Sequence, residues 1–177
     1  MKGALSLEAL TQFGAQIAEQ RFAYDFVIVK NETTHEGDGT KNEEYYCFGK
    51  EILAPASGKV VEAVDTVADN SPGTMNAQEP VGNHVILDHG NGEFSFLAHL
   101  KYGSVAVKQG DTVETGQLLG LWGNSGHSSE SHLHYHLQTT AIFQQGEGLP
   151  TQFQSYMADG AFVKRGEPTR GQQIQSK

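Results

Sequence analysis

Cysteine is almost missing from this chain of 177 residues, in which Cys47 stands alone. One cysteine cannot form a disulfide within the chain, and it excludes a metal site made of several thiolates. We expect Cys47 to be a buried, unreactive thiol. Long hydrophobic runs are missing as well, and no stretch approaches the roughly 20 apolar residues of a membrane-spanning helix.

Positive charge is scarce, because 12 lysines and arginines stand against 21 aspartates and glutamates, for a net charge of -9. Nucleic acids and anionic membrane surfaces attract proteins with basic surfaces. The balance therefore argues against a nucleic-acid partner and against a polybasic membrane-surface protein. It identifies neither the partner nor the oligomeric state.

A secretory signal is not visible either, since residues 1–20 lack a charged segment followed by an apolar one. Two interpretations are open at this point. The protein is intracellular, or the chain is a fragment or mature form without its targeting information. The sequence leaves the localisation unknown.

Glycine and aromatic residues are plentiful, with 21 Gly, 9 Phe and 6 Tyr. This composition favours a mainly β fold with many turns, and the length fits a single domain with a real core. Alternating and β-branched patterns predict strands at 22–29, 84–88 and 93–100. Apolar positions within 5–19 follow one helical face, interrupted by Gly14, and predict a short N-terminal helix.

Two stretches, 54–61 and 107–117, resemble each other and the repeated elements of biotinyl and lipoyl carrier domains. We therefore predict antiparallel sheets of the duplicated, barrel-sandwich hybrid type. A carrier needs a modifiable lysine on a hairpin between the two stretches, but that interval holds His84, His89 and His99 instead. Carrier function is thus a poor match, and an unmodified mass after co-expression with a ligase would exclude it.

The segment Ser131–His136 contains histidine at every second position, namely His132, His134 and His136. Side chains of a β-strand alternate between faces, so these three imidazoles project from the same side. Neighbouring members can converge on one small ligand. His132 and His136 lie about 13 Å apart along an extended strand, so the three cannot share one ion. A polar face with solvated imidazoles is the weaker alternative.

An ordered set of motifs resembles that of the lysostaphin/LytM-type zinc metallopeptidases, metallopeptidase family twenty-three. The motifs are Asp25, Ala54-Pro55-Ala56-Ser57-Gly58, Gly82-Asn83-His84-Val85-Ile86, Ala98-His99-Leu100, Gly123-Asn124-Ser125-Gly126 and His132-Leu133-His134. Each piece alone is weak, whereas their order is specific. The segment Gln20–Asp25, with its Gln-Arg-aromatic-Ala-x-Asp pattern, and the tail 148–171 are similar to one subgroup of that family.

The resemblance implies a zinc-dependent endopeptidase that cuts peptidoglycan cross-links or glycine-rich peptides, in the cell envelope or secreted. It implies Asp25 and His134 as ligands of one zinc ion, and His99 and His132 as catalytic histidines. Zinc accepts imidazole and carboxylate ligands and lowers the pKa of a bound water to about 7. From the residues alone, Asp25 also suits a surface turn, and His99 also suits a core histidine.

The match is incomplete at the first zinc ligand. Arg21 occupies the histidine position of an H-x-x-x-D motif, and a guanidinium has no lone pair for a metal. In the subgroup the histidine lies further upstream, where this chain has Gly14. Leu97 stands where many relatives carry tyrosine. His136 stands where many carry glutamate, and we expect it to support a ligand or to line the groove.

Three interpretations follow from the missing ligand. His35 supplies the third donor from its loop, the site is altered, or the domain is a degenerate, non-catalytic member that binds cell wall or protein. The third protein ligand is not identified from the sequence. We predict an N-terminal helical segment at 1–20, a peptidase-like β domain at 21–140 and a C-terminal extension at 141–177 that packs on or trails from the same domain.

Overall fold

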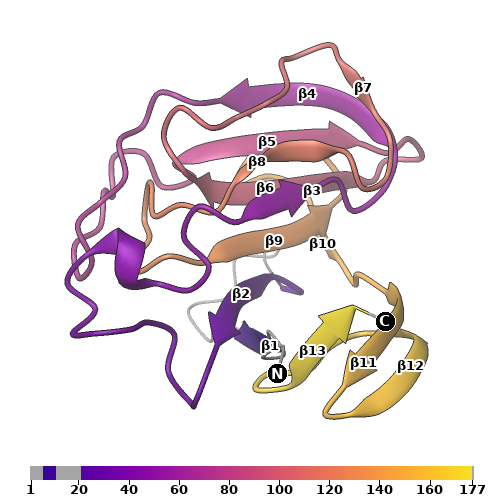
Figure 1. The fold of residues 1–177 in the computed structure, drawn as a ribbon. Helices are drawn as coiled ribbons and strands as arrows, with labels where there is room; N and C mark the ends of the chain where they lie inside the picture. The colour runs from indigo at the N-terminus through magenta and orange to yellow at the C-terminus, as the bar shows by residue number, and fades with distance from the viewer. Residues whose placement is uncertain (1–5, 11–20, 177) are drawn as a thin grey trace.

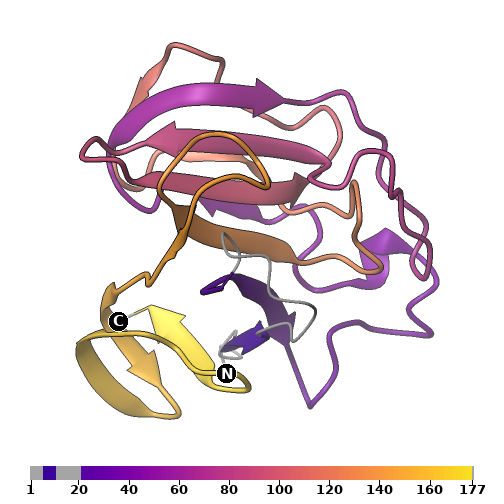
Figure 2. The same cartoon turned by 180° about the vertical axis from the view of Figure 1, so that it is seen from behind.

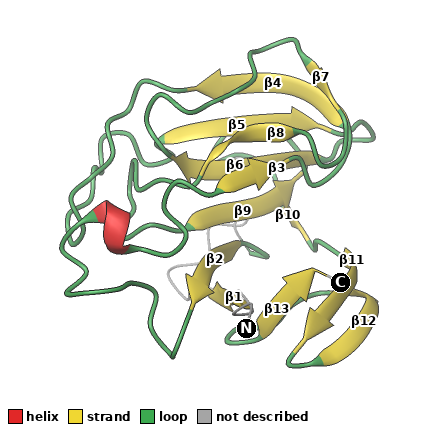
Figure 3. Cartoon of the chain, in the orientation of Figure 1, coloured by secondary structure: helices red, strands yellow, loops and turns green. Residues whose placement is uncertain are grey.

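The computed structural model describes residues 6–10 and 21–176 of the chain. Within them the chain is built of antiparallel strands and one 3-10 helix, η2 (Asn42–Glu44), which Figure 3 shows as a single red turn. The predicted mainly β fold is therefore confirmed. The predicted N-terminal helix is wrong where it overlaps strand β1 (Ser6–Leu10), and its remainder, 11–19, lies outside the described residues.

The strands follow one another through short turns and longer loops. Their bounds are β1 (Ser6–Leu10), β2 (Tyr24–Val29), β3 (Glu51–Leu53), β4 (Gly58–Val64), β5 (Asn83–Asp88), β6 (Phe94–Leu100), β7 (Thr112–Val113), β8 (Leu118–Leu121), β9 (Leu133–Gln138), β10 (Gly148–Leu149), β11 (Phe153–Ala158), β12 (Ala161–Gly166) and β13 (Gln173–Ser176).

One large sheet contains eleven of these strands, in the order β12-β11-β13-β1-β2-β9-β6-β5-β4-β7, with β10 paired to β9. The small sheet β3-β8 lies in front of the large one in Figure 1. On the opposite face, Figure 2 shows the orange segment after β9 arching over β6 and β5. The large sheet thus has a core face and a second face on which a loop folds back.

The hydrophobic core follows from strand alternation. Leu133 and Tyr135 of β9 point into it, and Leu97 of β6 lies directly opposite Tyr135 in the register. The intervening residues of β9 must then face the other side. Leu97, which replaces the tyrosine of many relatives, is thus a core residue with 2% of its surface exposed.

Cys47 is fully buried in this core, as its isolation in the sequence suggested. Its Sγ lies 3.1 Å from the carbonyl oxygen of Ser131, to which it donates a hydrogen bond. Burial raises the pKa of the thiol above its usual value. A thiol held neutral in this way is a poor nucleophile, so its role is packing.

The C-terminal strands join the same large sheet, because β13 pairs with β1 and β1 with β2. Phe153, at the start of β11, packs edge-on against the rings of Tyr24 and Phe26. The division of the chain at residues 20 and 140 stays a prediction. The described part of the chain has no helix long and apolar enough to cross a membrane.

Candidate functional site

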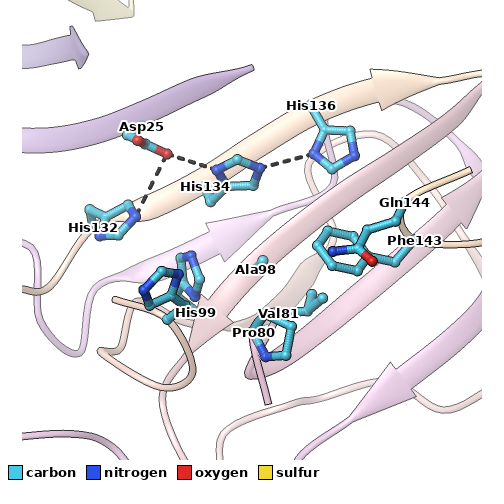
Figure 4. Close-up of a pocket in the computed structure, with 11 residues that line it drawn as sticks. Asp25, Pro80, Val81, Ala98, His99, His132, His134, His136, Phe143 and Gln144 are labelled. Atoms are coloured by element: carbon cyan, nitrogen blue, oxygen red, sulfur yellow. Dashed lines mark hydrogen bonds and ion pairs between the residues drawn. The ribbon is translucent and has the colours of Figure 1, made fainter. Parts of the chain in front are cut away.

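The site begins with a pairing of two strands that are distant in sequence. Asp25 on β2 lies directly opposite His134 on β9 in the antiparallel register. Their side chains meet, with 2.8 Å between Asp25 Oδ1 and His134 Nδ1 (Figure 4). Asp25 is buried, with 7% of its surface exposed. A carboxylate from the start of the described chain is thus placed beside the histidine strand.

The three alternating histidines lie on the face of the large sheet opposite the core. His134 Nε2 lies 3.0 Å from His136 Nδ1, and His132 Nε2 lies 3.6 Å from Asp25 Oδ1. The ring of His136 stacks on Phe96 with 4.5 Å between centroids. The common side that strand alternation predicts for the three imidazoles is confirmed, and neighbouring members do converge.

His99 reaches the same place through an irregularity in β6. The register with β5 pairs Leu100 with Asn83 and Ala98 with His84, which leaves His99 as an extra residue. Its φ of 65° lies in the left-handed region, which is rare for a residue with a side chain. A β-bulge re-aims side chains in this way. As a result both Ala98 and His99 line the pocket.

His99 and His132 are anchored alike. Nδ1 of His99 lies 2.8 Å from the carbonyl oxygen of Ser125, and Nδ1 of His132 lies 2.9 Å from that of Glu130. A carbonyl oxygen only accepts, so each Nδ1 carries the hydrogen and donates it. Each Nε2 of a neutral ring is then a bare acceptor. The two rings lie 4.7 Å apart, centroid to centroid.

Burial and charge set the protonation of the cluster. Burial alone would raise the pKa of Asp25, but the hydrogen bond and charge of His134, with smaller effects of His132 and His99, lower it overall. Burial, followed by the charges of His132 and His134, lowers the pKa of His99 well below its usual value. Burial and then the charge of His134 lower that of His136 to about 3. The cluster therefore combines an ionised carboxylate with two neutral imidazoles.

Two residues that complete the pocket could not be recognised in the sequence. Phe143 and Gln144, in the segment that arches over the sheet, line it together with Pro80 and Val81 (Figure 4). No spacing in the polar stretch after β9 indicates where that stretch folds. His127 is exposed to solvent and also lines the pocket.

The two residues that the resemblance implies as zinc ligands, Asp25 and His134, meet in this pocket. Asp25 Oδ1 and His134 Nδ1 converge as two donors of the right chemistry. The residues of 6–10 and 21–176 include no group of three or more His, Cys, Asp or Glu placed to hold a metal. His35 does not line the pocket and packs against Tyr45 instead. The described residues therefore fit two ligand positions and leave the third without a protein donor.

Comparison with known proteins identifies the family of the chain. The model of peptidase family M23 matches residues 44–146, more than half of the chain. The chain belongs to this family. The match includes His99, His132 and His134, whereas Asp25 lies ahead of it and is placed by its pairing with His134. The subgroup indicated by Gln20–Asp25 stays a prediction.

The M23 domain has relatives in longer proteins. It is 43% identical over 90 residues to the peptidoglycan DD-endopeptidase ShyA of Vibrio cholerae. This match covers 50% of this chain and 19% of ShyA. It is 34% identical over 96 residues to an uncharacterized metalloprotease of Haemophilus influenzae, covering 53% of this chain and 18% of that protein. The matched region is thus about a fifth of the curated relatives.

Solved structures show the same fold. LytU superposes with a TM-score of 0.51 at 19% identity, covering 85% of this chain and 83% of that one. A variant of the catalytic domain of the prophage-encoded M23 protein EnpA from Enterococcus faecalis superposes with a TM-score of 0.50 at 20% identity, covering 85% and 91%.

Proposed function

We propose that the histidine pocket hydrolyses peptide bonds in peptidoglycan cross-links, as the site of a zinc endopeptidase. The observation that carries this proposal is the meeting of Asp25 and His134 at 2.8 Å, with His132 and His99 beside them in one pocket. Four side chains from three strands or strand ends converge there. Membership of family M23 and the likeness to a peptidoglycan DD-endopeptidase support the substrate class.

Asp25 and His134 would hold the zinc ion. When bound, zinc polarises a carbonyl group and lowers the pKa of a coordinated water. The third ligand position is not filled by a described residue.

His99 and His132 are suited to proton transfer and to charge stabilisation. Their Nδ1–H groups are held by the carbonyls of Ser125 and Glu130, so each ring keeps one orientation. A neutral ring can take a proton from the attacking water at Nε2, and a protonated ring can donate to the oxygen of the scissile carbonyl. The lowered pKa of His99 keeps its ring neutral and able to accept.

The pocket walls suit a peptide. Val81, Pro80 and Phe143 provide apolar contacts, and the side-chain amide of Gln144 can both donate to and accept from a peptide bond. Such a wall excludes water on one side while a few polar groups fix the orientation of the ligand.

A second candidate function is a non-catalytic module that binds peptidoglycan or a protein in the same pocket. The observation that favours it is the missing third donor among the described residues. Gly14 and Arg21 at the two possible ligand positions of the sequence point the same way.

The two functions are separated by one experiment on the full chain. Untreated protein is analysed for zinc and incubated with purified cross-linked muropeptides and with pentaglycine, with and without a chelator. The proposal expects bound zinc and chelator-sensitive cleavage, lost in His132→Ala and kept in His89→Ala. Metal-free protein that binds muropeptides without cleaving them contradicts hydrolysis and supports the binding module.

The alignment of the missing ligand has a separate test. Gly14→His is expected to raise zinc affinity sharply, because three protein ligands replace two. Gln12→His, two residues away, is the matched control and should raise it far less. Affinity is measured by competition with a chromophoric chelator. Equal affinities for the two variants and the wild type would count against the position of Gly14 in the site.

A further inference from the structure

A row of paired residues crosses the large sheet from the site toward β4. Asp25 on β2 pairs with His134 on β9. His134 pairs in turn with Ala98 on β6, and Ala98 pairs with His84 on β5. Residues directly opposite one another in antiparallel strands project from the same face of the sheet. His84 therefore projects from the face that carries the imidazoles of the site.

The row places His84 within reach of a peptide bound at the site. Neighbouring strands lie about 4.8 Å apart, so His84, two strands beyond His134, is about 10 Å from it. An extended peptide advances about 3.4 Å per residue and spans this distance in about three residues. Between the two histidines the row contains only the methyl side chain of Ala98, which lines the pocket (Figure 4).

The ring of His84 is held in one orientation. Its Nδ1 lies 2.7 Å from the carbonyl oxygen of Gly82. A carbonyl oxygen only accepts, so Nδ1 carries the hydrogen and donates it. Nε2 of the uncharged ring is then a bare acceptor. The side chain of His84 is mostly buried, with 11% of its surface exposed.

Glu62 on β4 adds a carboxylate beside this nitrogen. It pairs with Ile86, so it lies diagonally opposite His84 on the same face of the sheet. Glu62 Oε1 is 3.6 Å from His84 Nε2, beyond the length of a hydrogen bond. The side chain of Glu62 is 52% exposed, and within residues 6–10 and 21–176 it pairs with no lysine or arginine. Two acceptors thus lie side by side at the surface without a described donor between them.

We propose that His84 and Glu62 form a subsite for a primary ammonium group of the substrate, such as the side chain of a diamino acid about three residues from the bond that is cut. An ammonium group has three N–H donors and a positive charge, so it can donate both to Nε2 and to the carboxylate. A negatively charged group would be repelled by Glu62. Because the subsite selects substrates for the pocket, it rests on the proposed function.

The charge state of His84 is the first test. Nitrogen-15 NMR of the ring in the full chain at neutral pH should show a hydrogen on Nδ1 and none on Nε2. A doubly protonated ring would be the cationic partner of Glu62 itself. That result would overturn the proposal, because no acceptor pair would be left for an ammonium group.

Binding of two matched probes is the second test. One probe is a cross-linked muropeptide with a free side-chain amino group, and the other is the same muropeptide after N-acetylation. The full chain carries His132→Ala, so that calorimetry measures binding without cleavage. We expect the free form to bind about 5-fold more tightly, the upper end for an exposed ion pair. Only the free form should shift the ring signals of His84.

Variants of the carboxylate assign this preference to the subsite. Glu62→Gln keeps the shape of the side chain and removes its charge, so the two probes should bind equally. Glu62→Lys should reverse the preference, because it repels the ammonium group. Glu51→Gln is the matched control, since Glu51 is an exposed glutamate on β3 of the small sheet. It should keep the preference for the free form.

The outcomes distinguish the subsite from the peptidase. Equal binding of the two probes before Glu62 is changed, or a preference that survives Glu62→Gln, would refute the subsite even if the wild type cleaves both. A preference that depends on Glu62, in a wild type that cleaves neither probe, would refute the peptidase and keep the subsite. Failure of both probes to bind would refute both.

Discussion

The imidazoles of His99 and His136 are enclosed where water cannot solvate their charged forms, with 7% and 1% of their surfaces exposed. Burial is the main cause of the lowered pKa of both. In the unfolded chain a histidine titrates near its ordinary pKa of about 6.5. As the pH falls, the unfolded state therefore binds protons first. The two neutral rings therefore make their full contribution to the free energy of unfolding above about pH 6.5. That contribution is lost as the pH falls toward the pKa of the folded state.

For His136, with a folded pKa of about 3, this linkage gives a measurable slope. Between pH 7 and pH 5, metal-free wild type should lose about 2 kcal/mol more unfolding free energy than His136→Phe. Urea unfolding at the two pH values measures the difference, and circular dichroism checks that both proteins start folded. Equal losses in the two proteins would show that His136 is not held neutral.

At the scale of elements, the loop that carries Ser125 is packed against the start of β5. A Cβ added to Gly82 would lie 2.5 Å from the carbonyl oxygen of Ser125, and one added to Gly126 would lie 2.5 Å from the Gly82 nitrogen. The Ser125 carbonyl also accepts the Nδ1–H of His99. The close approach of two glycines therefore fixes an acceptor that orients a catalytic candidate.

Gly82→Ala should consequently lower the free energy of unfolding by more than the cost of placing an alanine in a left-handed backbone conformation. Gly90→Ala is the matched control, because Gly90 has a similar left-handed φ of 81° but nothing within 4 Å of the added Cβ. Gly90→Ala should lower the free energy of unfolding by about 1–2 kcal/mol, the usual cost of an L-amino acid with a left-handed backbone conformation. Gly82→Ala should lose at least about 2 kcal/mol more, a typical cost of overpacking. Similar losses in a urea titration would mean that the loop yields without strain.

At the scale of the whole molecule, the site-bearing strands are buttressed by the C-terminal part of the chain. The order β13-β1-β2-β9 links the last strand to the strands of Asp25 and His134. Across the sheet face, Phe153 contacts Tyr24 and Phe26, which flank Asp25, as well as Tyr135, which follows His134.

Phe153→Ala should therefore destabilise the protein by about 3 kcal/mol, the cost of removing a packed phenylalanine. Phe162→Ala on the neighbouring strand β12 is the control, because Phe162 is 50% exposed, and we expect it to lower the free energy of unfolding by less than about 1 kcal/mol. Chemical denaturation measures both. A small loss for Phe153→Ala would show that the C-terminal strands do not support β2 and β9.

Local patterns anticipated much of the fold and part of the site. Alternation alone predicts that His132, His134 and His136 share a face, since the period of a strand is two. The helical pattern at 5–19 misled, because Ser6–Leu10 pairs with β2 and β13, and such long-range pairing overrides local periodicity.

The sequence by itself determined a mainly β chain and three imidazoles in a row, because these depend on neighbours a few residues apart. Only the tertiary structure decided that Asp25 faces His134, that a bulge turns His99 inward, and that Phe143 closes the pocket. The first of these depends on a register between residues 109 positions apart, and the other two depend on the β5–β6 register and on the path of a loop. No local periodicity encodes any of the three.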